Sequence, residues 1–252
     1  MAPPTSAAPF LWLLAAGSWE RSFSQKPTAK SITPYSVTPT AESRKLAQMR
    51  TAEVLSETSR VEAFSDGVFA IAITLLILEI RVPERAQAGA LGAALLHLWP
   101  SLLAFATSFF EIGVMWINHH RLFTVISTTD QRVLIWKMLL LFGIAFLPFP
   151  TALMARHLTG PGGWEAAALY NATLFFIALA YHFLWRYASR DRHLIPSDVD
   201  QRSLDGITNQ YRFGPAIYFA ALIALSWNGV LTLVVHLALA IYFILPPSRF
   251  RK

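Results

Sequence analysis

The sequence contains no cysteine, and only 14% of its 252 residues are charged. Without cysteine the chain has no disulfide, no thiolate metal site, no cysteine nucleophile and no thioether-linked haem. Common catalytic motifs are also missing, since it has no Gly-x-Ser-x-Gly elbow, no His-Glu-x-x-His pair and no phosphate-binding loop. We therefore expect a protein that is not an enzyme and that carries no cofactor or metal.

Apolar residues dominate what is present. Hydrophobic residues make up 54% of the chain and the mean hydropathy is +0.44, a composition typical of an integral membrane protein. The formal net charge of +6 could suggest nucleic-acid binding, but no basic patch with interleaved aromatic residues lies outside the apolar segments. In a membrane chain a basic excess marks cytoplasmic loops and contact with anionic lipid. We expect membrane lipid, and not nucleic acid, as a partner.

The chain divides into a tail and an all-α membrane core. Residues 1–58 are rich in Pro, Ser, Thr and Ala and predict a disordered tail. Residues 59–247 contain six segments that could cross the bilayer, and residues 248–252 form a basic C-terminal end. The six segments span approximately 62–82, 98–119, 133–155, 164–187, 213–227 and 230–246. Asn228 and Gly229 form a turn signal, so we expect the last two segments to form a tight hairpin.

The basic residues fall mostly on one side of such a six-helix arrangement. The tail, the loop from Arg121 to Lys137, the loop from Arg186 to Arg212 and the C-terminus hold 18 of the 21 lysines and arginines. Arg81, Arg85 and Arg156 lie on the opposite side. The positive-inside rule therefore predicts that both termini are cytoplasmic.

The first crossing, RVEAFSDGVFAIAITLLILEI, begins with charged and polar residues. A narrow stripe runs along this helix through Gly67, Ile71, Thr74 and Leu78, while Glu62 and Asp66 lie on roughly the opposite side. One face could meet copies of itself about an axis, and the other could be held in the bundle of its own chain. The same spacing is also compatible with a structural role, in which the stripe packs against other helices as any apolar face does. Asp66 would then be an aspartate at the start of a helix that is hydrogen-bonded to a neighbouring helix.

The stretch EIGVMWINHHRLF, at the end of the second crossing, offers partners for this carboxylate at the same depth. Indole and imidazole nitrogens of Trp116, His119 or His120 could donate hydrogen bonds to Asp66 or Ser65. A metal site that uses Glu111 and both histidines is disfavoured, because adjacent residues on a helix diverge by about 100°.

These residues carry a family resemblance. Arg60, Phe64, Ser65 and Asp66 match an Arg-x-x-x-Phe-Ser-Asp signature, which GVFAIAITLLILEI and later WINHHRLF follow. From Arg60 to the last crossing the chain resembles the bacterial branch of the transmembrane protein 175 family of potassium channels. The resemblance implies a six-helix unit that assembles as a homotetramer in a bacterial plasma membrane, with potassium ions as the permeant species and the first helix lining the pore.

The resemblance also implies roles for individual residues. A ring of bulky apolar side chains and a threonine layer would form the constriction, and the matching positions are Ile71, Thr74 and Leu78. The signature residues would hold the first helix against its neighbours; we call them the clasp, and their implied partners are Trp116, Asn118, and His119 or His120. The sequence contains no Thr-Val-Gly-Tyr-Gly loop, so we expect a hydrophobic constriction with modest selectivity and not a carbonyl filter.

The sequence also allows two other classes of membrane protein. A secondary transporter is expected to contain broken helices and an internal repeat. Pro148 and Pro150 interrupt the third crossing, but no matching break occurs elsewhere in the sequence. The remaining class is a non-conducting membrane scaffold or a membrane-embedded enzyme.

Overall fold

The structure is a computed structural model in which every regular element of the described part of the chain is a helix. It describes residues 45, 60–83, 91–128, 130–190, 194–196 and 199–244, without the side chains of residues 202, 203 and 242–244. Apart from residue 45, the predicted tail and the predicted C-terminal end lie outside the described residues.

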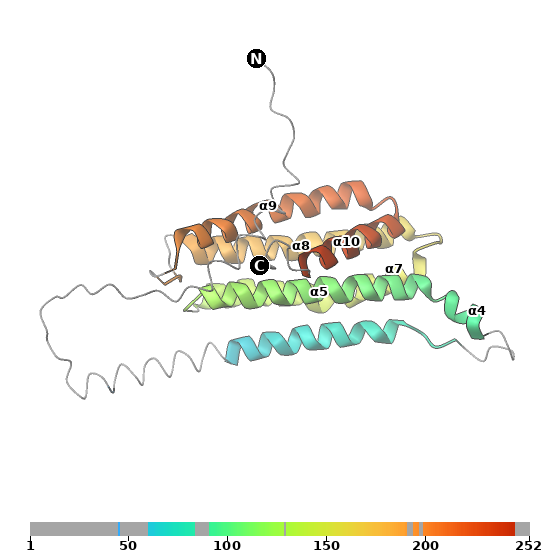
Figure 1. Cartoon of the computed structure of the whole chain (residues 1–252), viewed down its shortest axis with the longest axis horizontal. Coiled ribbons are helices and arrows are strands. Elements are labelled where there is room, and N and C mark those ends of the chain that lie inside the picture. The colour runs from blue at the N-terminus through green and yellow to red at the C-terminus, as the bar shows by residue number, and fades with distance from the viewer. Residues whose placement is uncertain are drawn as a thin grey trace, which may run out of the picture.

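Figure 1 shows the described helices in the order in which they follow along the chain. We call Arg60–Glu79 the first helix; its last turn is the 3-10 helix η1 (Leu76–Glu79). The others are α4 (Leu91–Leu96), α5 (Trp99–Val125), α6 (Gln131–Phe146), α7 (Pro148–His157), α8 (Gly163–Ser189), α9 (Gln201–Leu225) and α10 (Gly229–Ile244).

Four helices of the described part are long and apolar enough to cross a membrane. They are the first helix, α5, the combined run Gln131–His157 and α8. A helix of 20 residues, such as the first helix, is about 30 Å long, which matches the hydrocarbon core of a bilayer. The prediction of an all-helical membrane protein is therefore confirmed.

The last two helices differ in character from these four. α9 begins at Gln201, ahead of the apolar segment that was predicted from residue 213. Its polar first half is helical because Leu204, Ile207 and Tyr211, at spacings of three and four, form a buried stripe. α10 follows after a short turn, in which the Asn228 side chain accepts a hydrogen bond from the Leu231 amide at 3.0 Å.

Local chemistry explains where α6 starts and why the third apolar run is divided. The Asp130 side chain accepts a hydrogen bond from the Val133 amide at 2.8 Å and so caps α6. α6 ends at Phe146, and α7 begins directly after Leu147 with Pro148, which lacks the amide proton that a continuous helix needs.

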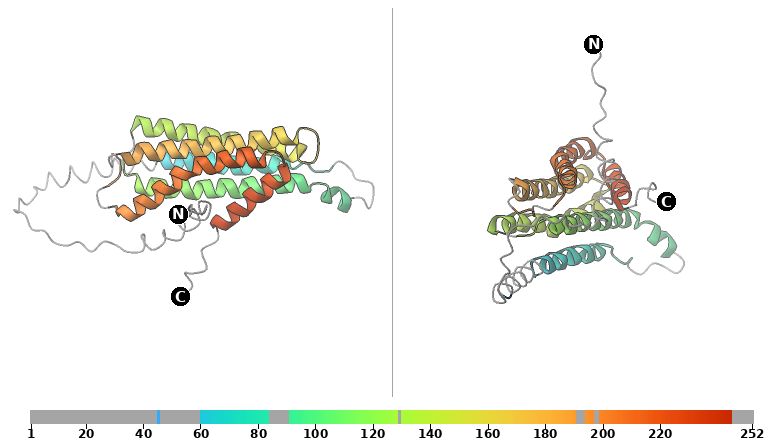
Figure 2. Two further views of the ribbon diagram at one scale, coloured as in Figure 1. Left: turned by 90° about the horizontal axis from the view of Figure 1, so that it is seen from above. Right: turned by 60° about the vertical axis from the view of Figure 1, so that its left-hand side comes forward.

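The helices lie side by side as a bundle (Figures 1 and 2). The first helix lies at one edge, beside α5, and α9 lies at the opposite edge against α8. α10 packs on α5 and α8, while α6 and α7 pack on α8 and α5 respectively. The position of the first helix leaves a large part of its surface outside the bundle.

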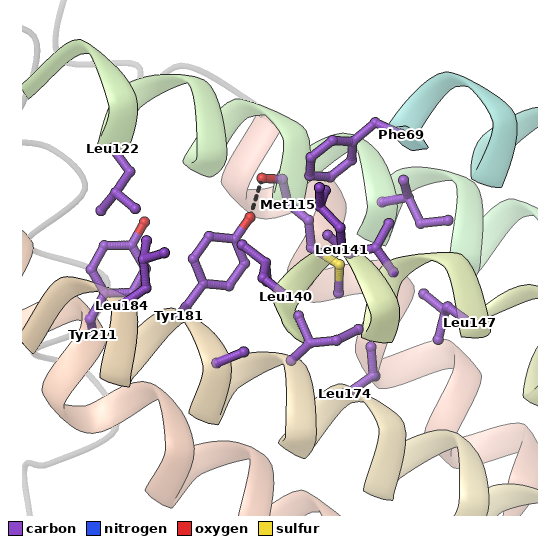
Figure 3. Packing of buried hydrophobic residues seen from close by; sticks show 14 of the residues in the cluster. Phe69, Met115, Leu122, Leu140, Leu141, Leu147, Leu174, Tyr181, Leu184 and Tyr211 are labelled. Atoms are coloured by element: carbon purple, nitrogen blue, oxygen red, sulfur yellow. Dashed lines mark hydrogen bonds between the residues drawn. The ribbon is translucent and has the colours of Figure 1, made fainter. Parts of the chain in front are cut away.

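The core lies between α5, α6 and α8, and Figure 3 shows part of its packing. The Tyr181 hydroxyl on α8 donates a hydrogen bond to the Met115 carbonyl on α5 at 2.6 Å. Phe69 from the first helix lies against the same cluster. At Gly143 on α6 the helices come so close that a Cβ would lie 2.7 Å from the Ile177 Cγ1 on α8.

Candidate functional site

The first helix has one face that is buried in its own chain. Ser65, Phe69, Ala72 and Leu76 follow at spacings of four, three and four, and none of them is more than 1% exposed. Such spacing places all four on one side of a helix. This face packs against α5, and the final turn η1 also contacts α7.

The stripe of Gly67, Ile71, Thr74 and Leu78 lies on the other side and is exposed. Ile71 is 60% exposed and Leu78 is 70% exposed. Only 22% of the most apolar window of this helix is buried, compared with 56% of the corresponding window of α8. The described part of the chain therefore leaves a continuous apolar face uncovered, and such faces mark contact with lipid or with another protein surface.

Thr74 presents an oxygen atom to this exposed face. Its hydroxyl lies 2.9 Å from the Ala70 carbonyl and 3.0 Å from the Ile71 carbonyl, and it acts as the donor toward both. Threonine in a helix often bonds back to its own backbone in this way. Because its single proton is directed at the backbone, the hydroxyl oxygen can offer lone pairs to a donor or a cation on the exposed side.

The clasp end of the first helix is bonded to α5. The Trp116 indole donates a hydrogen bond to the Asp66 carboxylate at 3.0 Å. His120 stacks on the Trp116 ring, with centroids 6.1 Å apart and ring planes at 18°. The structure therefore brings Asp66 and Trp116 together, and it places His120 beside the indole.

The clasp residue Ser65 and the predicted partner His119 take no part in this contact. Ser65 donates to the carbonyl of Val61 in its own helix at 3.0 Å. His119 is 1% exposed and lies between two aromatic rings, with centroid distances of 5.3 Å to Phe69 and 4.6 Å to Phe123. Its Nε2 atom has no hydrogen-bond partner among the described residues.

The remaining predicted residues lie away from the Asp66–Trp116 contact. Asn118 faces α9, where Gln210 donates to its side-chain oxygen at 3.4 Å and Tyr211 donates to its carbonyl at 3.4 Å. The side chains of Arg60 and Phe64 are exposed. The signature thus spans both faces of the first helix.

Lys137 also contacts the start of the first helix, and the sequence alone did not predict this. The distribution of basic residues predicts a position in the loop from Arg121 to Lys137, yet Lys137 lies in α6 and is only 2% exposed. Its ammonium group donates to the Val61 carbonyl at 3.0 Å and lies 4.0 Å from the centroid of the Phe123 ring. A single lysine inside the apolar run LIWKMLLLF is a signal that could have identified it, because charges within membrane helices are usually paired or functional.

The other end of the first helix is tied to α7. Glu79 and Arg156 form an ion pair at 3.2 Å, with side chains 30% and 54% exposed. Beside it lies a cavity of about 370 Å³, whose lining includes Leu75, Leu78 and Phe149. The exposed stripe is therefore flanked by a polar contact at each end of the helix.

No group of three histidine, aspartate or glutamate side chains in the described ranges could hold a metal ion. Glu111 lies 3.1 Å from His236 on α10, away from the His119 and His120 side chains that the disfavoured metal site would have required.

Comparison with known proteins assigns the family. Residues 60–148 match the family model described as endosomal/lysosomal potassium channel TMEM175. The chain is 49% identical over 193 residues to a potassium channel of Chamaesiphon minutus, which covers 75% of this chain and 95% of the relative. A potassium channel of Streptomyces collinus is 39% identical over 190 residues, with 75% and 92% covered.

A solved structure agrees with these relatives. The crystal structure of a lysosomal potassium-selective channel TMEM175 homolog from Chamaesiphon minutus matches with a TM-score of 0.66 and 49% identity. The match covers 75% of this chain and 96% of that structure. The chain is an all-helical integral membrane protein that belongs to the TMEM175 family, a family of channels and not of enzymes.

Proposed function

We propose that this protein is a potassium-permeable channel in which four copies surround a pore lined by their first helices. The observation that carries the proposal is the uncovered stripe of the first helix, which is apolar apart from the Thr74 hydroxyl. One chain contributes one such helix, so several copies are needed to enclose a pore. The number four follows the family resemblance, and the potassium ion follows the relatives described above.

The constriction would be formed by rings of Ile71 and Leu78. Among the large apolar side chains of the first helix these two are the most exposed, so they would approach one another about a shared axis. A ring of apolar side chains can stop conduction by dewetting. It offers no ligand to an ion, and selectivity must then depend on how easily the ion loses part of its water.

Thr74 lies between these two rings and would supply oxygen ligands. With its proton directed at backbone carbonyls, four copies would present four oxygen atoms to the pore. They could replace part of the hydration shell of potassium, which sheds water more readily than sodium does. This layer would act in place of a carbonyl filter.

The same proposal includes the topology. Six crossings, with α9 and α10 as the last two, would place both termini on the cytoplasmic side of a bacterial plasma membrane. The distribution of lysine and arginine supports this orientation. In it, the contact between Asp66 and Trp116 would lie at the cytoplasmic end of the pore.

Reconstituted protein in potassium-loaded liposomes tests the proposal. We expect passive potassium flux in the wild type and altered flux in the variants Ile71→Asn and Leu78→Asn. Ile223→Asn is the matched control, because Ile223 on α9 is 59% exposed but lies at the opposite edge of the bundle. Absence of cation flux, or equal flux in wild type and both stripe variants, would overturn the proposal.

Two measurements distinguish the proposed channel from a secondary transporter and from a non-conducting scaffold. Flux that saturates and requires a counter-ion would identify a secondary transporter. A monomer in native mass measurement would favour a non-conducting scaffold, because a single first helix cannot enclose a pore.

A further inference from the structure

A second polar site lies inside the bundle, on the far side of α5 from the uncovered stripe. It contains Glu111 near the middle of α5, His236 near the middle of α10 and Asn171 on α8. The three side chains belong to residues that are 3%, 1% and 1% exposed. Ionisable groups at this depth of a membrane bundle are costly unless they are paired, so they are functional candidates.

Two hydroxyl groups near the α9–α10 turn determine how Asn171 is oriented. Ser226 Oγ lies 2.5 Å from the Leu222 carbonyl, and Thr232 Oγ1 lies 2.8 Å from the Leu225 carbonyl. A carbonyl cannot donate, so each short contact requires the hydroxyl proton. Both hydroxyl oxygens must then act as acceptors toward Asn171, whose amide nitrogen lies at 3.2 Å and 3.5 Å from them.

This orientation assigns the state of one histidine nitrogen. With its NH₂ group directed at the hydroxyls, Asn171 presents its carbonyl oxygen to His236 Nε2 at 3.0 Å. An oxygen acceptor requires a proton on Nε2. The tautomer of His236 is therefore set by hydroxyl groups that the histidine does not contact.

The other nitrogen then shares a proton with Glu111. His236 Nδ1 lies 3.1 Å from Glu111 Oε1, and a hydrogen bond there needs one proton, on either atom. With no proton between these atoms, a carboxylate would face an imidazole lone pair. With a proton on each atom, two donors would face each other and a net charge would be buried. We propose that Glu111, His236 and Asn171 form a proton-binding site that holds one shared proton and ties α10 to α5 and α8.

Two tyrosine rings pack against His236, and the hydroxyl proton of one of them, Tyr170, is directed away from the pair. Tyr170 on α8 meets the His236 ring edge-on with a centroid distance of 6.0 Å, and Tyr218 on α9 stacks on it at 6.0 Å and 11°. Thr151 donates to the Leu147 carbonyl at 2.8 Å, Ser108 lies 2.7 Å from Thr151, and the Tyr170 hydroxyl lies 3.1 Å from Ser108. By the same reasoning as above, the Tyr170 proton is directed at Ser108 and not at Glu111.

The site predicts an unusual dependence of stability on pH. In an unfolded chain the carboxyl group has a pKa of about 4.3 and the imidazole a pKa of about 6.5. The unfolded pair therefore holds two protons below the lower value, one between the two values and none above the higher value. In the folded site the contact between His236 Nδ1 and Glu111 Oε1 is a hydrogen bond only when the pair holds one proton. Its contribution to stability is therefore largest between these two values. It is lost as the pH falls below about 4.3 or rises above about 6.5.

In the variant Glu111→Gln we expect stability to depend on pH in the opposite direction. A glutamine amide can donate to a neutral His236, so the folded state holds no shared proton while the unfolded histidine still binds one below about pH 6.5. The stability of this variant should rise from pH 5 to pH 6.5 and then level off, while that of the wild type falls above pH 6.5. For one proton the unfolding equilibrium constant changes about tenfold per pH unit.

Two measurements on the full chain test the site, and neither depends on the proposed channel activity. The first is reversible unfolding in mixed detergent micelles from pH 5 to pH 8.5; opposite trends in wild type and Glu111→Gln are expected, and parallel trends would overturn the proposal. The second is nitrogen-15 NMR of the wild-type protein in lipid at pH 7, with His236 assigned through its backbone correlations. A protonated Nε2 is expected, and an unprotonated Nε2 would overturn the assignment even if the variant fails to fold.

Discussion

The indole nitrogen of Trp116 lies 3.0 Å from the carboxylate of Asp66, so α5 holds the first helix by a hydrogen bond to a charged group. Most of the other contacts of the first helix are apolar, made by the buried face of Phe69, Ala72 and Leu76. The hydrogen bond therefore adds direction to a packing interface that could otherwise slide or rotate.

Removing the donor should weaken this attachment. We expect Trp116→Phe to lower the free energy of unfolding by about 1 kcal/mol, since it loses one exposed hydrogen bond and keeps most of the ring. Unfolding in mixed detergent micelles measures the effect. Asp66→Asn is the matched control, because its side-chain oxygen still accepts from the indole, and it should cost less than Asp66→Ala. Additive effects of Trp116→Phe and Asp66→Ala would contradict a direct interaction.

Lys137 should contribute more than a loop charge does. In Lys137→Met the Val61 carbonyl loses a charged donor and the acidic Glu62 and Asp66 lose a nearby positive charge. We expect a loss of about 1 to 3 kcal/mol in the free energy of unfolding. The control is Arg212→Met, where the side chain is exposed and a change within about 0.5 kcal/mol is expected. Equal effects of both variants would show that Lys137 is not a structural contact.

Thr74 allows a test of the oxygen layer that is separate from the apolar rings. Thr74→Val has nearly the same shape but no hydroxyl, and we expect its potassium over sodium permeability ratio to fall about two- to tenfold, the range that one lost polar interaction produces. Reversal potentials under bi-ionic conditions in planar bilayers give this ratio. Thr74→Ser keeps the hydroxyl and should remain close to wild type. A Thr74→Val channel with an unchanged ratio would remove the threonine layer from the mechanism.

The close approach of α6 and α8 depends on a glycine. A methyl group at position 143 would lie 2.7 Å from Ile177 Cγ1 and 3.0 Å from Phe176 Cδ1, so Gly143→Ala should lower the free energy of unfolding by about 1 to 3 kcal/mol. Gly113→Ala in α5 is the control, because nothing lies within 4 Å of its added Cβ. That variant should be neutral or more stable by up to about 1 kcal/mol. Thermal or chemical unfolding of both variants measures these two changes in the free energy of unfolding.

The sequence alone determined the class of protein and the position of its main helices. Apolar runs of about 20 residues in a chain with few charges leave a bilayer as the only solvent in which they are stable, and their backbone groups must then bond within helices. The two faces of the first helix could also be predicted, because helical periodicity separates Ile71, Thr74 and Leu78 from Asp66. α9 could not be bounded in this way, since its first half is amphipathic and lacks a continuous apolar run.

Tertiary structure decided which polar groups meet. Asp66 needed a donor, and several residues of α5 could have supplied it; only the rotation and height of the two helices selected Trp116 and turned Asn118 toward α9. Lys137 became buried because α6 packs where the clasp end of the first helix lies. Glu111 and His236 are far apart in sequence and carry no shared motif. Their bond at 3.1 Å exists because α10 folds back onto α5, a relation that depends on packing between distant segments and not on any local pattern.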